Sequence, residues 1–195
     1  IGLCLVGSEM CIRDSVMRRL IQSSGAEVIH LGHDQSAKAV VDCAVQEDAH
    51  AVALTSYQGG HVEYFTYIRQ LLDEAGCEHV RIFGGGGGTI TPPEIRTLHQ
   101  SGISKIYSPD DGRTMGLMGM IHHLMEHASK VDLIGGDRLA SINGPVTPED
   151  MSKIGLLMTL SESADEATFK AAVETARSSD TVSYTHLTLP TNCVV

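Results

Sequence analysis

Short apolar runs alternate with longer segments of helical periodicity along most of this sequence, and this alternation constrains the fold more than any other feature. Four of the runs are typical of strands, and the run AVAL is apolar throughout, as expected for a strand buried on both faces. The predicted strands are residues 27–31, 51–54, 80–83 and 105–107. Apolar residues at helical spacing predict helices at residues 16–24, 36–47, 62–75, 92–100 and 112–127. Strands separated by helices form βαβ units, so the sequence predicts a parallel sheet with right-handed crossovers.

A fifth strand belongs before Val16, and residues 1–7 (IGLCLVG) are apolar enough to form it. Five strands in a doubly wound α/β sheet favour the flavodoxin-like order 2-1-3-4-5. Ligands of such sheets bind beyond the carboxyl ends of the strands, at the switch point between the first and third strands. Besides the loop before Val16, three loops are predicted there: residues 55–61 (TSYQGGH), 84–91 (GGGGGTIT) and 107–112 (YSPDDG).

Five consecutive glycines, Gly84–Gly88, follow the fourth predicted strand. A backbone without side chains lets a flat or bulky ligand approach closely, and the alternative interpretation is a merely flexible loop. No Lys follows the glycines, so they do not form a phosphate-binding P-loop, and they follow the wrong strand for a dinucleotide fingerprint. A flavin mononucleotide site, which would use the loop after the first strand, remains an alternative.

Composition excludes several classes of protein. Fourteen basic against 24 acidic residues give a net charge of −10, which argues against a nucleic-acid binder. No apolar run is long enough to span a bilayer. The five cysteines are odd in number, widely spaced and without a Cys-x-x-Cys pair, which favours reduced thiols in a cytoplasmic protein over a disulfide framework or a zinc site.

Histidine pairs offer only weak candidates for metal sites. His30 and His33 would face opposite sides of a continuing strand, and no third ligand accompanies them. His123 and His127 lie one turn apart on the last predicted helix, where we expect both to be exposed and unpaired. No arrangement of residues indicates a nucleophilic triad or a catalytic pair of carboxylates.

Four segments of the sequence together form a pattern that is specific for one protein family: VIHLGHDQS, TSYQGGHVEYF, IFGGGGGTITPPEI and IYSPDDG. They resemble the cobalamin-binding domain of adenosylcobalamin-dependent acyl-CoA mutases, and among these the fused isobutyryl-CoA mutase type in particular. The resemblance covers about residues 15–128. In that family the nucleotide tail of the cofactor enters a cleft of the sheet, and a histidine of the protein ligates cobalt.

The resemblance also implies which residues of this chain contact the cofactor. The family's Ser-x-Leu motif falls on Thr55–Tyr57, which keeps a hydroxyl group and an apolar wall, and its Gly-Gly falls on Gly87 and Gly88. Two further residues match positions that line the benzimidazole pocket, and His61 is expected at the edge of the corrin ring. The full implied set is Thr55, Ser56, Tyr57, Gly59, Gly60, His61, Gly85, Gly86, Gly87, Gly88, Tyr107 and Ser108.

One element of the family's pattern is missing. The cobalt ligand belongs to an Asp-x-His-x-x-Gly motif after the first strand, and the alignment places Met10 at the histidine and Ser8 at the aspartate. A thioether is a poor replacement for an imidazole held by a carboxylate. We therefore predict no metal ligand in this chain and weak cobalamin binding at most.

Both ends of the chain differ in character from the rest. The stretches LCLVGSEMCIRD and VSYTHLTLPTN resemble translated sequencing adapter, so residues 1–15 and 182–195 are expected to be non-native. Residues 16–128 are the predicted cobalamin-binding domain. Residues 129–181 contain two short amphipathic helices, which predict a helical linker towards a missing domain, with dimerisation helices as the alternative.

The predicted function is therefore that of a cobalamin-binding module from a fragmentary adenosylcobalamin-dependent acyl-CoA mutase, a carbon-skeleton isomerase. By resemblance, its partners are the catalytic barrel and the G-protein chaperone domain of the parent enzyme, and the chain holds no complete active site. Nucleic acid and membrane are not expected partners, and the expected location is cytoplasmic. The alternatives are a flavodoxin-like flavin-binding or signalling domain and the cobalamin module of a methyltransferase.

Overall fold

The computed structural model describes residues 1–7, 12–57 and 59–177, and its centre is a five-stranded, fully parallel sheet. The strand order is β2-β1-β3-β4-β5, which confirms the predicted doubly wound, flavodoxin-like fold. Residues of the amino-terminal segment do fill the first strand position. The strands are β1 (Gly2–Gly7), β2 (Glu27–His33), β3 (Ala51–Thr55), β4 (Arg81–Gly85) and β5 (Lys105–Tyr107).

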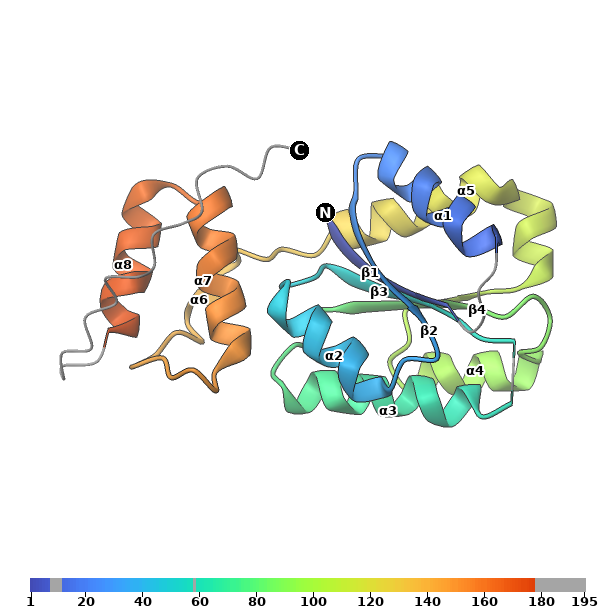
Figure 1. The fold of residues 1–195 in the computed structure, drawn as a ribbon, viewed down its shortest axis with the longest axis horizontal. Helices are drawn as coiled ribbons and strands as arrows, with labels where there is room; N and C mark the ends of the chain where they lie inside the picture. The colour runs from blue at the N-terminus through green and yellow to red at the C-terminus, as the bar shows by residue number, and fades with distance from the viewer. Residues whose placement is uncertain (8–11, 58, 178–195) are drawn as a thin grey trace.

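Helices cover both faces of the sheet, with α1 and α5 on one face and α2, α3 and α4 on the other (Figure 1). Three further helices follow this α/β unit. The helices are α1 (Ile12–Ser23), α2 (Ala37–Gln46), α3 (His61–Glu74), α4 (Pro92–Gln100), α5 (Pro109–Ser129), α6 (Gly136–Leu139), α7 (Met151–Ser163) and α8 (Glu166–Ala176).

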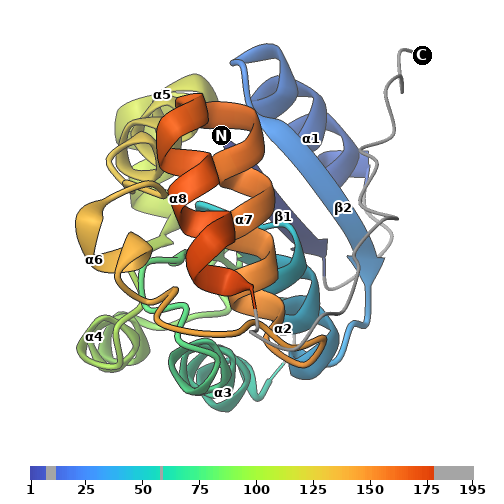
Figure 2. The ribbon, with the colours of Figure 1, turned by 90° about the vertical axis from the view of Figure 1, so that its left-hand side faces the viewer.

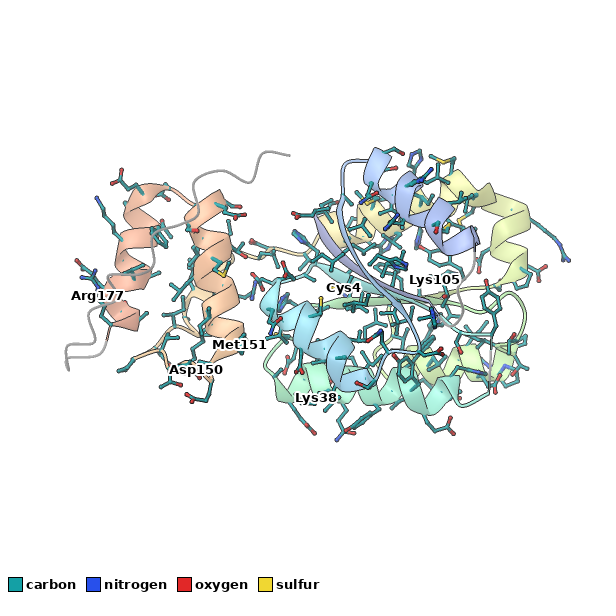
Figure 3. All side chains as sticks on the ribbon, in the orientation of Figure 1. Cys4, Lys38, Lys105, Asp150, Met151 and Arg177 are labelled. Carbon is teal, nitrogen blue, oxygen red and sulfur yellow. The ribbon has the colours of Figure 1, made fainter. Side chains whose placement is uncertain are left out.

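Alternation along the buried strands divides the core into two layers. In β1, Leu3 and Leu5 face the layer of α1 and α5, whereas Cys4 and Val6 face the layer of α2, α3 and α4. All four side chains are nearly or fully buried, as expected for a central parallel strand. The side chains drawn in Figure 3 fill the space between the sheet and the helices on both faces, with Cys4 near the middle of the sheet.

Several boundaries differ from the sequence-based prediction. Strand β4 continues through Gly84 and Gly85, so the prediction that all five glycines form a loop is wrong. Helix α5 begins at Pro109 rather than Gly112, because Ser108 caps it. The same helix is broken at Gly116, whose φ of 66° and ψ of 174° lie outside the helical region.

Helices α6–α8 pack at the end of the sheet where the strands begin, opposite the carboxyl edge (Figures 1 and 2). They have a small apolar core of their own, centred on Leu156 and Leu160. A buried polar network joins them to the α/β unit: Arg138 and Thr159 both bind the carboxylate of Asp48, which lies between α2 and β3. At Gly155, an added Cβ would lie 2.8 Å from the carbonyl oxygen of Val45, so α7 packs directly against the end of α2. The predicted linker is thus folded against the sheet unit.

Among the described residues, no helix combines the length and the apolar character needed to cross a bilayer.

Candidate functional site

The sheet register brings three predicted site residues into one row at the carboxyl edge. Thr55, Gly85 and Tyr107 are paired across β3, β4 and β5. Registered partners in a parallel sheet point to the same face, and this row faces the layer of α1 and α5. The middle member has no side chain, so the row forms a notch between a hydroxyl group and an aromatic ring.

This notch opens into a cleft of about 450 Å³. Leu5, Ala53 and Phe83 form its floor one row deeper in the sheet, and helices α1 and α5 form its walls. None of the described residues that line the cleft is an Asp, Glu, Lys, Arg or His. A cleft of this size that is apolar and uncharged suits a flat, neutral group.

Tyr107 is held rigidly at the side of the notch. Its hydroxyl donates to the carbonyl oxygen of Met120 at 3.2 Å and lies 3.0 Å from Nδ1 of His123. Its ring stacks on Phe83 with 6.4 Å between centroids. Burial, and to a lesser extent the nearby carboxylate of Asp111, raises the pKa of the Tyr107 phenol, so this wall of the cleft is neutral at physiological pH.

Ser108, next in the chain, is used as the amino-terminal cap of α5. Its Oγ accepts from the backbone N–H of Asp111 at 3.2 Å, and Asp111 Oδ2 in turn accepts from the backbone and hydroxyl of Ser108, both at 2.8 Å. Ser108 and Asp111 thus form a capping box at the start of α5. Ser108 still lines the cleft, but its hydroxyl already has a structural partner.

The glycine run divides into positions with different roles. At Gly84, an added Cβ would lie 2.6 Å from Ile106 Cδ1 and 2.8 Å from Phe65 Cε2, on the face away from the cleft. At Gly86 it would meet the carbonyl oxygen of Ser56, and at Gly87, where φ is +56°, it would lie 2.8 Å from the Tyr57 ring. At Gly85 the nearest atom is 3.9 Å away, so this glycine leaves open space in the cleft.

A second cavity of about 260 Å³ lies at the same edge, towards α2 and α3. Its lining is more polar and includes Ser56, Gly59, Gly60 and His61. His61 is not an exposed rim residue: it is only 6% exposed, and its Nε2 lies 3.4 Å from Glu94 Oε2 at the start of α4. Thr55 lines both cavities and donates to the carbonyl oxygen of Val6 at 3.4 Å.

The twelve predicted cofactor-binding residues are therefore brought to one edge, although around two cavities. Gly88 lines neither cavity, and its Cβ would contact Pro109. The predicted position of the missing cobalt ligand, Met10, lies outside the described residues. Sequence reasoning missed the walls of the main cleft, which are Val16, Met17, Leu117, Met120, Ile121 and Leu124.

The prediction for His123 and His127 is wrong. Both are half-buried, their rings stack at 4.2 Å between centroids, and His127 Nδ1 lies 2.9 Å from the carbonyl oxygen of His123. His123 also contacts Tyr107, so the pair supports the cleft wall from behind. Burial, followed by the neighbouring His127, lowers the pKa of His123. Within the described ranges, no three side chains of His, Cys, Asp or Glu form a group that could hold a metal ion.

Comparison with known proteins agrees with this geometry. Residues 15–136 match the sequence model of the B12 binding domain family. The fused isobutyryl-CoA mutase of Geobacillus kaustophilus is 45% identical over 163 residues, which are 83% of this chain and 15% of the relative. That of Nocardia farcinica is 55% identical over 121 residues, which are 62% of this chain and 11% of the relative. The chain thus spans a small part of the length of the relatives it matches.

A solved structure of a cobalamin-binding protein from Desulfitobacterium hafniense superposes with a TM-score of 0.52 at 17% identity. The superposition covers 65% of this chain and 58% of that one. At this identity the likeness concerns the fold alone.

Proposed function

Because the chain belongs to the family of B12-binding domains, we propose that it is the cobalamin-binding module of an adenosylcobalamin-dependent acyl-CoA mutase. The observation that carries the proposal is the uncharged, glycine-notched cleft at the carboxyl edge of the sheet. The nucleotide tail of cobalamin ends in a flat benzimidazole, and the open space over Gly85, between Thr55 and Tyr107, fits such a group.

In this proposal the predicted residues hold the cofactor in two places. The nucleotide tail would lie against Thr55, Tyr57, Gly85, Gly86, Gly87, Tyr107 and Ser108, which line the main cleft. Residues of the smaller cavity, Ser56, Gly59, Gly60 and His61, would lie towards the corrin, and Gly88 would complete the glycine turn. When bound, adenosylcobalamin supplies the radical chemistry of carbon-skeleton rearrangement. The cleft itself would bind the nucleotide tail and exclude water from it, since the described lining of the cleft holds no charged group.

The domain boundaries and partners belong to the same proposal. Residues 16–128 would form the cobalamin-binding domain and residues 129–181 the connection to the rest of a fused enzyme. The named relatives are fused mutases of which this chain matches only about 15% of the length or less, which supports further domains in the parent protein. From the family resemblance, we propose that these domains are a catalytic barrel and a G-protein chaperone. The odd number and wide spacing of the five cysteines support a cytoplasmic location. No structural observation favours the flavin or methyltransferase alternatives.

The cleft can be tested without cobalt by using the detached nucleotide tail, α-ribazole phosphate. We expect it to shift the amide NMR signals of β3, β4 and β5 on titration into the chain. Gly85→Val should abolish these shifts, because the new side chain fills the notch. The fold should tolerate the substitution, since the nearest atom to the added Cβ is 3.9 Å away.

Gly136→Val is the matched control, since an added Cβ at this position in α6 meets nothing within 4 Å and lies far from the cleft. Circular dichroism should show that both variants stay folded. Equal affinities of Gly85→Val and the unmodified chain for α-ribazole phosphate would refute the assignment of the cleft.

A further inference from the structure

The two loops at the edge of the cleft are joined at their beginning. The backbone N–H of Ser56, at the start of the loop between β3 and α3, donates to the carbonyl oxygen of Gly85 at 2.9 Å. A Cβ at Gly86 would collide with the carbonyl oxygen of Ser56, so glycine at this position permits direct backbone packing. This contact fixes one end of the loop pair.

A second link joins the same two loops at their far ends. His61 is the first residue of α3, and its Nε2 lies 3.4 Å from Oε2 of Glu94 in the first turn of α4. The same carboxylate oxygen accepts from the backbone N–H of Thr91 at 2.7 Å and from its hydroxyl at 2.6 Å. Glu94 therefore connects the end of the glycine loop to the start of the neighbouring helix.

The chemistry of the pair suits a link between helices. Hydrogen bonds from Thr91, with a smaller contribution from His61, hold the pKa of Glu94 below its ordinary value, so the carboxylate is ionised at neutral pH. A capping box needs only Thr91 and Glu94, so the buried imidazole is an addition to it. Gly60, just before His61, adopts a left-handed conformation (φ 81°) that turns the chain into α3 with the imidazole directed at α4.

We propose that His61 and Glu94 are positioning residues. They fix the distance between the loop residues Ser56, Tyr57, Gly59 and Gly60 and the glycine loop of residues 86–91, and thereby the width of the tail-binding cleft. This inference rests on the proposed function for its ligand. It gives His61 a role through the loops in addition to its place in the lining of the smaller cavity. We call the contact between His61 and Glu94 the clasp. It joins segments that lie 33 residues apart in the sequence, and neither of the two side chains lines the main cleft.

The test uses two measurements on the full chain. Hydrogen exchange of the loop amides, with no ligand added, tests the clasp alone, and NMR titration with α-ribazole phosphate tests its consequence for binding. His61→Leu keeps the bulk of the buried side chain but removes the polar contact. We expect faster exchange in both loops and an affinity lower by about three- to tenfold. His61→Gln, which keeps a donor, should restore part of both.

Glu94→Gln provides a second route that does not disturb the buried site, because Glu94 is 37% exposed. It should weaken binding on its own but add nothing in the His61→Leu background, since the contact is then already lost. Glu63→Gln is the matched control: Glu63 is an exposed acid in the same first turn of α3, and its removal should change neither measurement.

The outcomes separate the two proposals. Unchanged loop exchange in both His61→Leu and Glu94→Gln, or additive effects in the double variant, would overturn the clasp. If no version binds α-ribazole phosphate, the proposed function fails, and the exchange measurement still decides whether the clasp exists.

Discussion

Asp48 should make a large electrostatic contribution to the stability of this chain. Its side chain is 4% exposed and lies in the network that joins α6 and α7 to the α/β unit. Arg138 donates two hydrogen bonds to it, at 2.6 and 3.1 Å, and Thr159 donates one at 2.8 Å. His79 Nε2 lies 3.6 Å from the same carboxylate. We predict that Asp48→Asn destabilises the chain at neutral pH and that the effect disappears in acid.

The magnitude follows from the pKa of the Asp48 carboxyl. Burial alone would raise this pKa, but the interactions with His79, Arg138 and Thr159 outweigh burial and lower it from 3.8 to about 2. A lowering of the pKa by this amount corresponds to roughly 2 to 3 kcal/mol of stability. Because the folded-state pKa is depressed, the stabilisation is fully present above about pH 4 and is lost as the pH falls through about 2. At pH 3 about half of this stabilisation should remain.

Asparagine is the cleanest substitution because Asp48 has a positive φ of 44°, which Asn tolerates better than most residues. At pH 7 the loss of stability should be about 2 to 5 kcal/mol, with the upper end expected if Arg138 stays buried without a counter-ion. The measurement is urea denaturation followed by far-UV circular dichroism, since the chain has no Trp, at pH 7, 4 and 3. A stability difference between Asp48→Asn and the unmodified chain that stays constant from pH 7 to pH 3 would refute the reasoning.

Two further predictions concern the glycine run and the missing cobalt ligand. Gly84→Ala should lower stability by about 1 to 3 kcal/mol, because the new Cβ would meet Ile106 and Phe65, whereas Gly85→Ala should be nearly neutral. Thermal denaturation measures the midpoints of the two variants. Equal midpoints would contradict the packing role of Gly84. The fourfold substitution Ser8→Asp, Glu9→Gly, Met10→His and Cys11→Asp should create base-off cobalamin binding, seen as nitrogen superhyperfine splitting in the electron paramagnetic resonance of the cobalt(II) form. The same splitting in the unmodified chain would show that another histidine is the ligand.

The fold was predictable because buried parallel strands leave a strong local signal. A continuous apolar run marks β3, and the alternation of strands with helices determines the doubly wound arrangement. Boundaries that depend on capping were less clear: Gly112 looked like the start of a helix, whereas the capping box of Ser108 and Asp111 begins α5 at Pro109, three residues earlier. The break at Gly116 lies within a segment of helical periodicity, so local pattern alone does not reveal it.

The candidate site was predictable only in part, because its glycines look identical in the sequence. Gly84 packs against Phe65 and Ile106, while its neighbour Gly85 opens the cleft. The two differ only because successive residues of a strand face opposite sides of the sheet. The walls of the cleft come from α1 and α5, which lie far apart in the sequence and meet only in the folded chain. Apolar residues at helical spacing, such as Leu117 and Met120, are the signal that could have indicated the α5 wall.

The two ends of the sheet differ in chemistry, and this difference argues for a division of labour. At the carboxyl edge, the described lining of the cleft is uncharged, and its walls depend on contacts such as those of Tyr107. At the opposite edge, the charged network of Asp48 joins segments 90 residues apart in the sequence and holds α6 and α7 in place. A charge buried near the cleft would have to be desolvated again when an apolar ligand binds, whereas a charge at the amino edge stabilises the fold without that cost. Substitutions at Asp48 should therefore change the free energy of unfolding while leaving the affinity of the folded chain for the nucleotide tail unaltered.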